Sequence, residues 1–259
     1  MRNRIDKIRV FLELTKNDFK NKFAGSMLGT FWAFMQPIVN VTIYWFIFEK
    51  GLKSQPMDGF PYLLWLIAGI CPWFFFNEAL NSASNSLVEY SYIVKKVKFP
   101  VAIIPAIKIF SALYVHCFFV VLINVIYIGY GKGISIYVLQ TVYYSFCVLA
   151  LATAISYFIA AISVFFKDMT QIVSIFLQYA MWFAPIMIDE RQFPEIVQKL
   201  MKYNLMYYPI CGYRDAMINK VWFWEHLELS LYFWICTFGL FVFGYFVFKR
   251  MRPHFADVL

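Results

Sequence analysis

The stretch VAIIPAIKIFSALYVHCFFVVLINVIYIG, residues 101–129, is almost wholly apolar and carries one charged side chain, Lys108. A helix rises about 1.5 Å per residue and the hydrocarbon core of a bilayer is about 30 Å thick, so this stretch is long enough to cross a membrane. The whole chain is 62% hydrophobic and 15% charged, whereas soluble domains have about 25% charged residues. The sequence therefore predicts a membrane protein.

Apolar runs of similar character occur at five other places in the chain. They cover residues 31–49, 61–83, 134–166, 169–188 and 228–248. Backbone polar groups in lipid must be satisfied within helices or closed barrels, and these runs lack the alternation of barrel strands. We predict an all-α membrane protein with six transmembrane helices, formed by residues 1–259 as a single domain.

The distribution of lysine and arginine predicts the orientation, because cytoplasmic segments carry an excess of them. Basic residues concentrate at the N-terminus, after the second and fourth spans, and at the C-terminus, so we expect both termini in the cytoplasm. The outer stretch 189–227 breaks this pattern. Its basic residues are Arg191, Lys199, Lys202, Arg214 and Lys220. The net charge of +8 is thus a topology signal, and we expect no nucleic-acid partner.

Residues 4–23 mix charges of both signs with apolar residues, which is not the pattern of a signal peptide. The apolar residues that recur at steps of three and four are Ile5, Ile8, Leu12, Phe19 and Phe23. One apolar stripe on a charged helix is typical of an amphipathic helix in the membrane surface. The alternative is a helix that packs within a small soluble cap.

Residues 87–99 connect the second and third predicted spans and place apolar residues among lysines. They can form a short helix that Pro100 stops, because the residue before proline disfavours helix. A short helix held at both ends by membrane spans is suited to dock into a groove of a partner protein. The alternative is a loop whose lysines serve only the topology.

Five groups of residues, spread over nearly the whole chain, carry a family resemblance. They are Ala24-Gly25-Ser26-Met27-Leu28-Gly29 with Phe31-Trp32 and Gln36-Pro37; Ile93 to Pro100 with Pro105; Ala184-Pro185-Ile186; Pro209 with Tyr213-Arg214; and Arg252 to Leu259. They resemble the permease subunit of type-2 ABC exporters, in the group that moves lipid-linked polysaccharides such as O antigens, capsules and teichoic acids.

The resemblance implies that residues 87–99 are the coupling helix that docks into a separate ATPase subunit, and that residues 4–23 are the interface helix beside it. The residues expected to couple to the ATPase are Glu89, Tyr92, Lys95, Lys96, Lys98 and Phe99. The chain has no GxxxxGK[ST] phosphate loop of its own. We expect a homodimer with two ATPase subunits that bind ATP and Mg²⁺, and a permease that is not itself an enzyme.

The resemblance also implies that residues 189–227 contain re-entrant gate helices at the outer leaflet, over 193–203 and 210–220. The expected gate residues are Pro185, Pro209, Tyr213 and Arg214. The family usually has Asn-Pro where this chain has Tyr208-Pro209, and Ser-Pro-Ile where it has Ala184-Pro185-Ile186. These departures bear on the shape of the gate. The alternative is a folded outer loop without a gating role.

Polar side chains within the spans form another set. Gln36 and Asn40 lie four residues apart on the first span, and Gln171, Ser174 and Gln178 follow one face of the fifth. Polar groups in lipid are costly, so these side chains should face the bundle interior or a wet path. They either hold the bundle together by hydrogen bonds or, as the resemblance implies for these two spans, line the path of the polymer.

The remaining ionisable residues give weaker signals. His116 has no metal partner at helical spacing, which favours a satisfied interior histidine. Glu78 and Lys108 lie near the cytoplasmic ends of adjacent spans, where they could pair or snorkel. The five cysteines show no ligand or framework spacing, so we expect neither a metal nor disulfides.

The favoured function is export of a lipid-linked polysaccharide, above all an O antigen, across the bacterial inner membrane. The same machinery could carry capsule, teichoic acid, a drug or a lipid. A membrane-embedded glycosyl or acyl transferase would need paired carboxylates or a His-carboxylate constellation at an interface, but Asp189-Glu190 is the one adjacent acidic pair and no DxD occurs. A secondary transporter would need ionisable residues at mid-span, for which Lys108 and His116 are the only candidates.

Overall fold

The computed structural model describes residues 5–96 and 100–259. Within these ranges the chain is helical, and its one β interaction is an isolated bridge between Met57 and Phe60. Five helical stretches of the described chain are long and apolar enough to cross a membrane. They are Phe31–Gly51, Tyr62–Ser84, Val101–Gly129, Ile136–Phe165 and Phe223–Val258. The prediction of an all-α, multi-pass membrane protein is confirmed.

The helices fall into three groups. The long helices are α2 (Phe31–Tyr44), continued by the π-helical η1 (Trp45–Gly51), α3 (Tyr62–Ser84), α6 (Ile104–Gly129), α7 (Gln140–Phe165) and α11 (Leu227–Met251). The shorter α-helices are α1 (Ile5–Asn21), α4 (Ser86–Glu89), α5 (Ser91–Lys96), α8 (Met169–Ala180), α9 (Glu195–Tyr203), α10 (Tyr207–Arg214) and α12 (Phe255–Val258). The other 3₁₀ or π turns are η2 (Val101–Ile103), η3 (Ile136–Leu139), η4 (Met181–Phe183), η5 (Glu190–Gln192), η6 (Asp215–Asn219), η7 (Phe223–His226) and η8 (Arg252–His254).

The fifth predicted span, 169–188, is not one continuous helix. Its helix α8 has 12 residues and therefore rises about 18 Å, which is short of a bilayer core of about 30 Å. After the turn η4 the chain becomes extended at Ala184, because a proline, Pro185, follows and disfavours helix in the residue before it. A full-length helix over 169–188 was therefore wrong, and the count of six spans stays a prediction.

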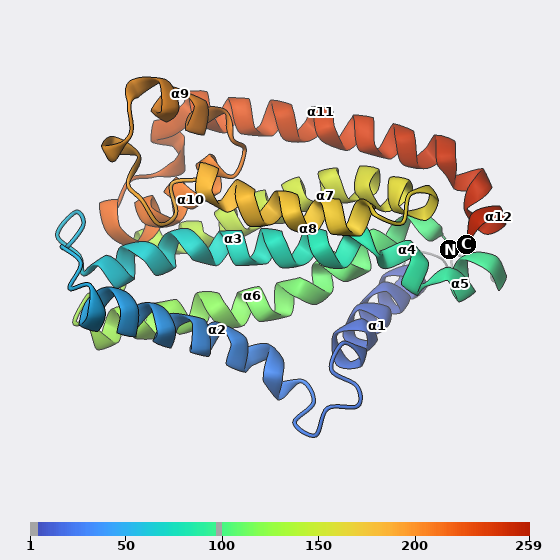
Figure 1. Ribbon diagram of the computed structural model, residues 1–259, viewed down its shortest axis with the longest axis horizontal. Coiled ribbons are helices and arrows are strands. Elements are labelled where there is room, and N and C mark those ends of the chain that lie inside the picture. The colour runs from blue at the N-terminus through green and yellow to red at the C-terminus, as the bar shows by residue number, and fades with distance from the viewer. Residues whose placement is uncertain (1–4, 97–99) are drawn as a thin grey trace.

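Helix α3 is the centre of the bundle (Figure 1). Most of its side chains are buried, because α6 and α7 pack along it and α8 and α10 cover further parts of its surface. Helix α11 packs in turn against α7. At Gly244 a Cβ atom would lie 2.8 Å from the carbonyl oxygen of Ala154, so this close approach of α11 to α7 requires glycine.

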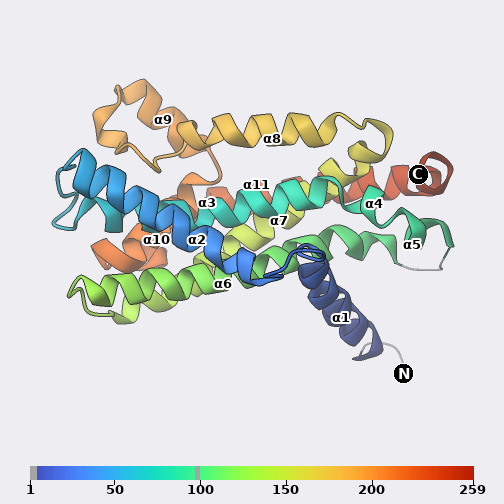
Figure 2. The same cartoon turned by 60° about the horizontal axis from the view of Figure 1, so that its bottom comes forward.

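The two ends of the bundle differ in what they hold. Helices α4, α5 and α12 lie at one end, toward which α1 also points, whereas α9 and α10 lie at the opposite end (Figure 1). We call these the terminal end and the α9–α10 end. Helix α1 runs obliquely to the bundle axis rather than along it (Figure 2). The amphipathic helix predicted over 4–23 is thus present as Ile5–Asn21, with residue 4 outside the described residues.

Aromatic contacts attach α1 to α6. Phe11 meets Phe110 at a ring-centroid distance of 5.2 Å, and Phe19 meets Tyr114 at 5.2 Å. The apolar side chains Ile8 and Leu12 remain exposed on another face. A helix with one protein-bound face and one exposed apolar face is suited to the membrane surface.

The segment predicted as one helix over 87–99 is broken. Helices α4 and α5 are separated at Tyr90, so the single-helix prediction was wrong. The Tyr90 hydroxyl donates a hydrogen bond to Asp18 of α1 at 2.9 Å, a long-range contact that local sequence does not reveal. Lys98 and Phe99, two of the expected coupling residues, lie outside the described residues.

Candidate functional site

A cavity of about 150 Å³ lies between α2, α3 and α6. Gln36 and Asn40, predicted from the first span, both line it. Asn77 and Glu78 of α3 line the same cavity. The structure therefore brings the two predicted polar residues of α2 together with a polar segment of α3.

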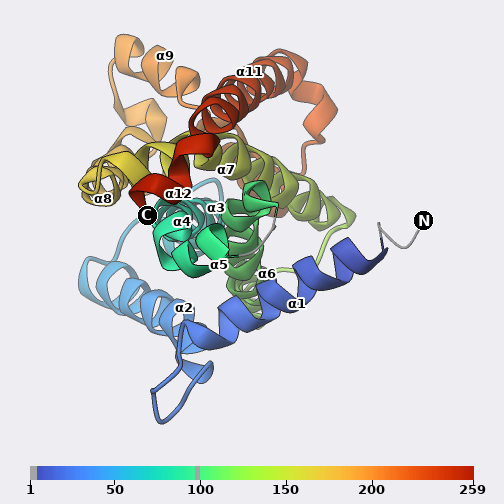
Figure 3. The same ribbon diagram turned by 90° about the vertical axis from the view of Figure 1, so that its right-hand side faces the viewer.

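The polar side of α8 contacts α3 through a hydrogen bond. Ser174 donates from Oγ to Asn81 Oδ1 at 2.7 Å, and Asn81 donates in turn to the carbonyl oxygen of Asn77 at 2.9 Å. Gln171 and Gln178 lie on the same side of α8 as Ser174 and are exposed. Viewed from the terminal end, α2 and α8 stand out on the same side of the molecule with α3 between them (Figure 3).

We call the set Gln36, Asn40, Asn77, Asn81, Gln171, Ser174 and Gln178 the amide face. The sequence analysis identified the α2 and α8 residues but missed Asn77 and Asn81. Their signal was available, because two asparagines four residues apart in an apolar run fall on one side of a helix. The structure adds the missing link, since this pair on α3 connects the α8 residues to the cavity beside α2.

A larger cavity, of about 490 Å³, adjoins the terminal end between α1, α3 and α6. Lys108 of α6 forms an ion pair with Asp18 of α1 at 2.7 Å, and a second one with Glu89 of α4. Glu78 pairs instead with Lys22, in the segment after α1. The expectation that Glu78 and Lys108 pair with each other was therefore wrong, because Lys108 is paired with Asp18 of α1 and Glu89 of α4, and Glu78 with Lys22 just after α1.

Tyr90 completes this ion cluster. Its ring lies under the ammonium of Lys108, 5.4 Å from the centroid. Burial, and next the negative charge of Asp18, raise the pKa of Tyr90 above its ordinary value, so the phenol keeps the proton that it donates to Asp18. One cluster thus joins α1, α6 and the segment α4–α5.

The expected coupling residues divide between this cluster and the surface. Glu89 is bound to Lys108, whereas Tyr92 and Lys95 are exposed on α5 and Lys96 ends that helix. The structure places α4 and α5 at the terminal end, next to α12 (Figure 1). Whether these residues bind a partner stays a prediction.

The expected gate residue Arg214 is buried at the end of α10, with 6% of its surface exposed. Its guanidinium donates hydrogen bonds to the carbonyl oxygens of Pro185 and Ile186 and lies 3.4 Å from the ring centroid of Trp65. A Cβ atom on Gly69 would come within 2.6 Å of this guanidinium, so the site depends on a glycine of α3. Arg214 therefore ties α10 to α3 and to the chain after α8.

Tyr213, the neighbouring residue that was also expected in the gate, faces the bundle interior. Its hydroxyl lies 2.6 Å from Ser145 Oγ and 3.0 Å from His116 Nε2. The His116 ring also stacks on Phe75 at a centroid distance of 4.5 Å. The prediction that His116 is a satisfied interior histidine is confirmed by these contacts.

Helix α10 begins earlier than predicted. The expected start at residue 210 was wrong, because the helix begins at Tyr207 and Pro209 lies in its first turn. Proline is tolerated there, since the first N–H groups of a helix have no partner within it. The first expected gate helix, 193–203, is present as α9, Glu195–Tyr203. A Cβ atom on Gly212 would overlap the Tyr144 ring, so glycine allows α10 to approach α7 closely.

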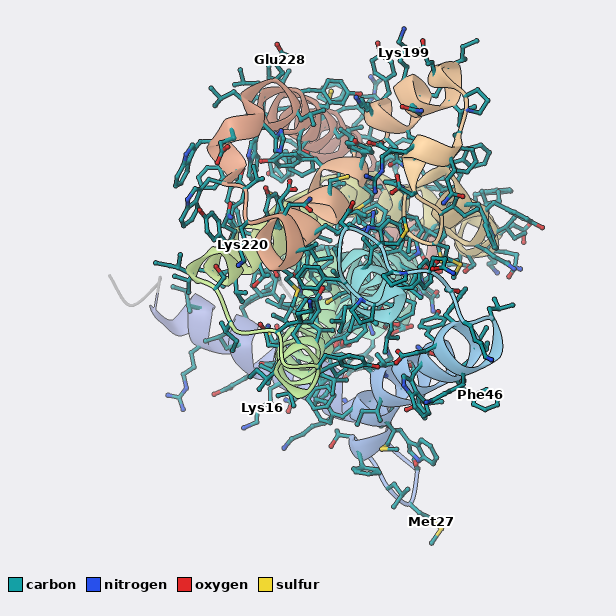
Figure 4. All side chains as sticks on the ribbon, turned by 90° about the vertical axis from the view of Figure 1, so that its left-hand side faces the viewer. Lys16, Met27, Phe46, Lys199, Lys220 and Glu228 are labelled. Carbon is teal, nitrogen blue, oxygen red and sulfur yellow. The ribbon has the colours of Figure 1, made fainter. Side chains whose placement is uncertain are left out.

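The basic residues of the stretch 189–227 have different environments. Arg191 pairs with Asp189 and, at 2.9 Å, with Asp58 of the segment that precedes α3. Burial acts to raise the pKa of Asp189, but the hydrogen bonds from Arg191 outweigh it and the pKa lies below its ordinary value. Lys199, by contrast, points away from the bundle at the α9–α10 end (Figure 4), and Lys220 is also exposed.

Comparison with known proteins gives a consistent set of matches. The profile of the ABC-2 type transporter family matches residues 9–218. Two O-antigen export system permease proteins, RfbA, from Klebsiella pneumoniae are each 26% identical over 255 residues, which cover 95% of this chain and 93% of each relative. The RfbA protein of Myxococcus xanthus is 27% identical over 177 residues, 67% of this chain and 65% of the relative. The family match spans the whole amide face.

Proposed function

Because the chain belongs to the ABC-2 type transporter family, we propose that it is the permease subunit of an ATP-driven exporter of lipid-linked polysaccharide. The proposed cargo is an O antigen, as the names of its relatives suggest for those proteins. Two copies of the chain would pair with two ATPase subunits that bind ATP and Mg²⁺. The complex would lie in the bacterial inner membrane with both termini in the cytoplasm.

The observation that carries this proposal is the amide face. Side-chain amides offer both donors and acceptors, which suits the hydroxyl groups of a sugar chain. Gln36, Gln171 and Gln178 are exposed in the single chain, although polar groups within a membrane normally face a bundle interior or a water-filled path. A second copy facing α2 and α8 would enclose these side chains in a passage.

The ATPase is proposed to bind at the terminal end. Helices α4 and α5 project there, and Glu89 is joined through Lys108 to Asp18 of α1. A push on α4 would therefore act on α1 and α6 together. In this proposal the ATPase changes the packing of these helices between two states, and the passage between the two copies opens or closes accordingly.

The first experiment is affinity purification of the chain from the membranes of its own cells, followed by mass spectrometry. Recovery of one ATPase subunit in a one-to-one ratio supports the exporter. Recovery of the chain without any ATPase would refute it.

Deletion of the gene should also remove a surface polysaccharide, and an unchanged cell surface would count against the proposed cargo.

A second experiment tests the coupling segment. Joint replacement of Lys95, Lys96 and Phe99 by alanine should release the ATPase while the permease remains folded, as judged by gel filtration. The matched control is joint replacement of Lys199 and Lys202 by alanine at the α9–α10 end. Equal recovery of ATPase from both variants would place the contact elsewhere.

A further inference from the structure

The amide face is polar but almost free of charge. Helices α2 and α8 contain no Asp, Glu, Lys or Arg, and α3 contains only Glu78. The seven side chains of the face are six amides and one hydroxyl, so each can both donate and accept hydrogen bonds without carrying charge.

Among the described residues that line the cavity beside α2, Glu78 is the one carboxylate, and it is already paired with a cation. Glu78 forms its ion pair with Lys22 and accepts a hydrogen bond from Ser82 at 2.8 Å. This pair lies where the cavity beside α2 adjoins the larger cavity of the terminal end, since both residues line both cavities. Because Lys22 and Glu78 are paired with each other, neither charge is available to bind an ion that passes the amide face.

Aromatic rings stand beside the amides. Phe23 and Phe74, which are both partly exposed, line the same cavity as Gln36 and Asn40. Rings of this kind offer apolar contact to the C–H faces of sugar rings, whereas a phosphate or carboxylate would lose its hydration there without gaining a cation. Desolvating an unpaired anion is strongly unfavourable in a low-dielectric site.

We propose that the exported polymer is a neutral glycan, whose repeat units carry no phosphate, uronate or other anionic group. This inference rests on the proposed function and narrows it: teichoic acids and acidic capsules are excluded as cargo. The amide face then selects by hydrogen bonding to hydroxyl groups, and each repeat unit passes without an electrostatic barrier or trap.

The composition of the cargo is the first test. The surface polysaccharide that the deletion strain lacks is isolated from wild-type cells. It is released from its lipid by mild acid and applied to an anion exchanger. A neutral glycan passes through the column and lacks phosphate and uronic acid. Retention on the column, with one anionic group per repeat unit, would overturn the inference but leave the proposed function intact. If deletion removes no polysaccharide, the proposed function itself fails.

Charge-sign variants supply the second test. The amount of surface polysaccharide per permease molecule is compared between an acidic and a basic variant at each of two sites. The pairs are Asn40→Asp with Asn40→Lys, and Gln178→Glu with Gln178→Lys. Lys199→Glu is the control outside the amide face. For a neutral cargo the acidic and basic variants of a site should differ by less than about twofold, whereas a polyanion would make the lysine variant better by about tenfold or more. The latter result would refute the inference. If the variants do not accumulate, the composition test still decides.

Discussion

Removal of the Arg214 guanidinium is expected to release α10 from the bundle. The guanidinium donates to the carbonyl oxygens of Pro185 and Ile186 and stacks on Trp65. A hydrogen bond to a charged group contributes about 1.5–3 kcal/mol, so loss of the two bonds costs at least about 3 kcal/mol. The buried cation–π contact adds about 2 kcal/mol. Arg214→Ala should therefore lower the local stability of α10 by at least about 5 kcal/mol.

Hydrogen exchange measures this loss directly. A change of about 5 kcal/mol corresponds to exchange of the α10 backbone amides that is faster by about three orders of magnitude or more, if the helix exchanges by local opening. The matched control is Arg250→Ala, because Arg250 is exposed near the end of α11. Wild-type exchange of α10 in Arg214→Ala would refute the anchoring role.

A double-mutant cycle identifies the contact responsible. Gly69→Ala alone should also speed exchange of α10, because the new methyl group would lie 2.6 Å from the Arg214 guanidinium. In the Arg214→Ala background the same change should have little further effect, since the group it displaces is gone. Additive effects would show that Gly69 acts through another neighbour.

Three other predictions concern packing and topology. Gly212→Ala should lower the melting temperature of the purified protein, because the new methyl group would overlap a tyrosine ring of α7. The control Gly239→Ala should leave the melting temperature unchanged, because no atom lies within 4 Å of the added methyl group. Equal melting temperatures of the two variants would contradict the close approach of α10 to α7. Lys108→Met should cost about 3–5 kcal/mol, because the buried carboxylate of Asp18 in α1 loses its ion-pair partner. Tryptic cleavage in α1 should then be faster, while the control Lys249→Met, at an exposed lysine outside α1, should leave cleavage in α1 as in the wild type. Lys199→Cys should react with an impermeant maleimide in intact cells above the wild-type background, and labelling only after lysis would reverse the orientation.

Sequence patterns predicted the long helices well and the polar contacts poorly. The run 61–83 reappears as α3, Tyr62–Ser84, because hydropathy and helical rise are local properties that add along the chain. The pairing of Glu78 could not be predicted, since Lys22 reaches it only through the path of α1 across α6. Likewise the predicted fifth span, 169–188, satisfied every compositional criterion and still ended as a helix at Ala180.

The sequence by itself determined that this chain is an all-α membrane protein, where most of its long helices lie, and which residues carry the family resemblance. Only the tertiary structure decided that Ser174 of α8 meets Asn81 of α3, that Arg214 anchors α10, and that α1 is bound through Asp18. The physical reason is that burial in lipid depends on composition within each helix. Polar contacts depend instead on the rotation and distance of helices that are far apart in the chain.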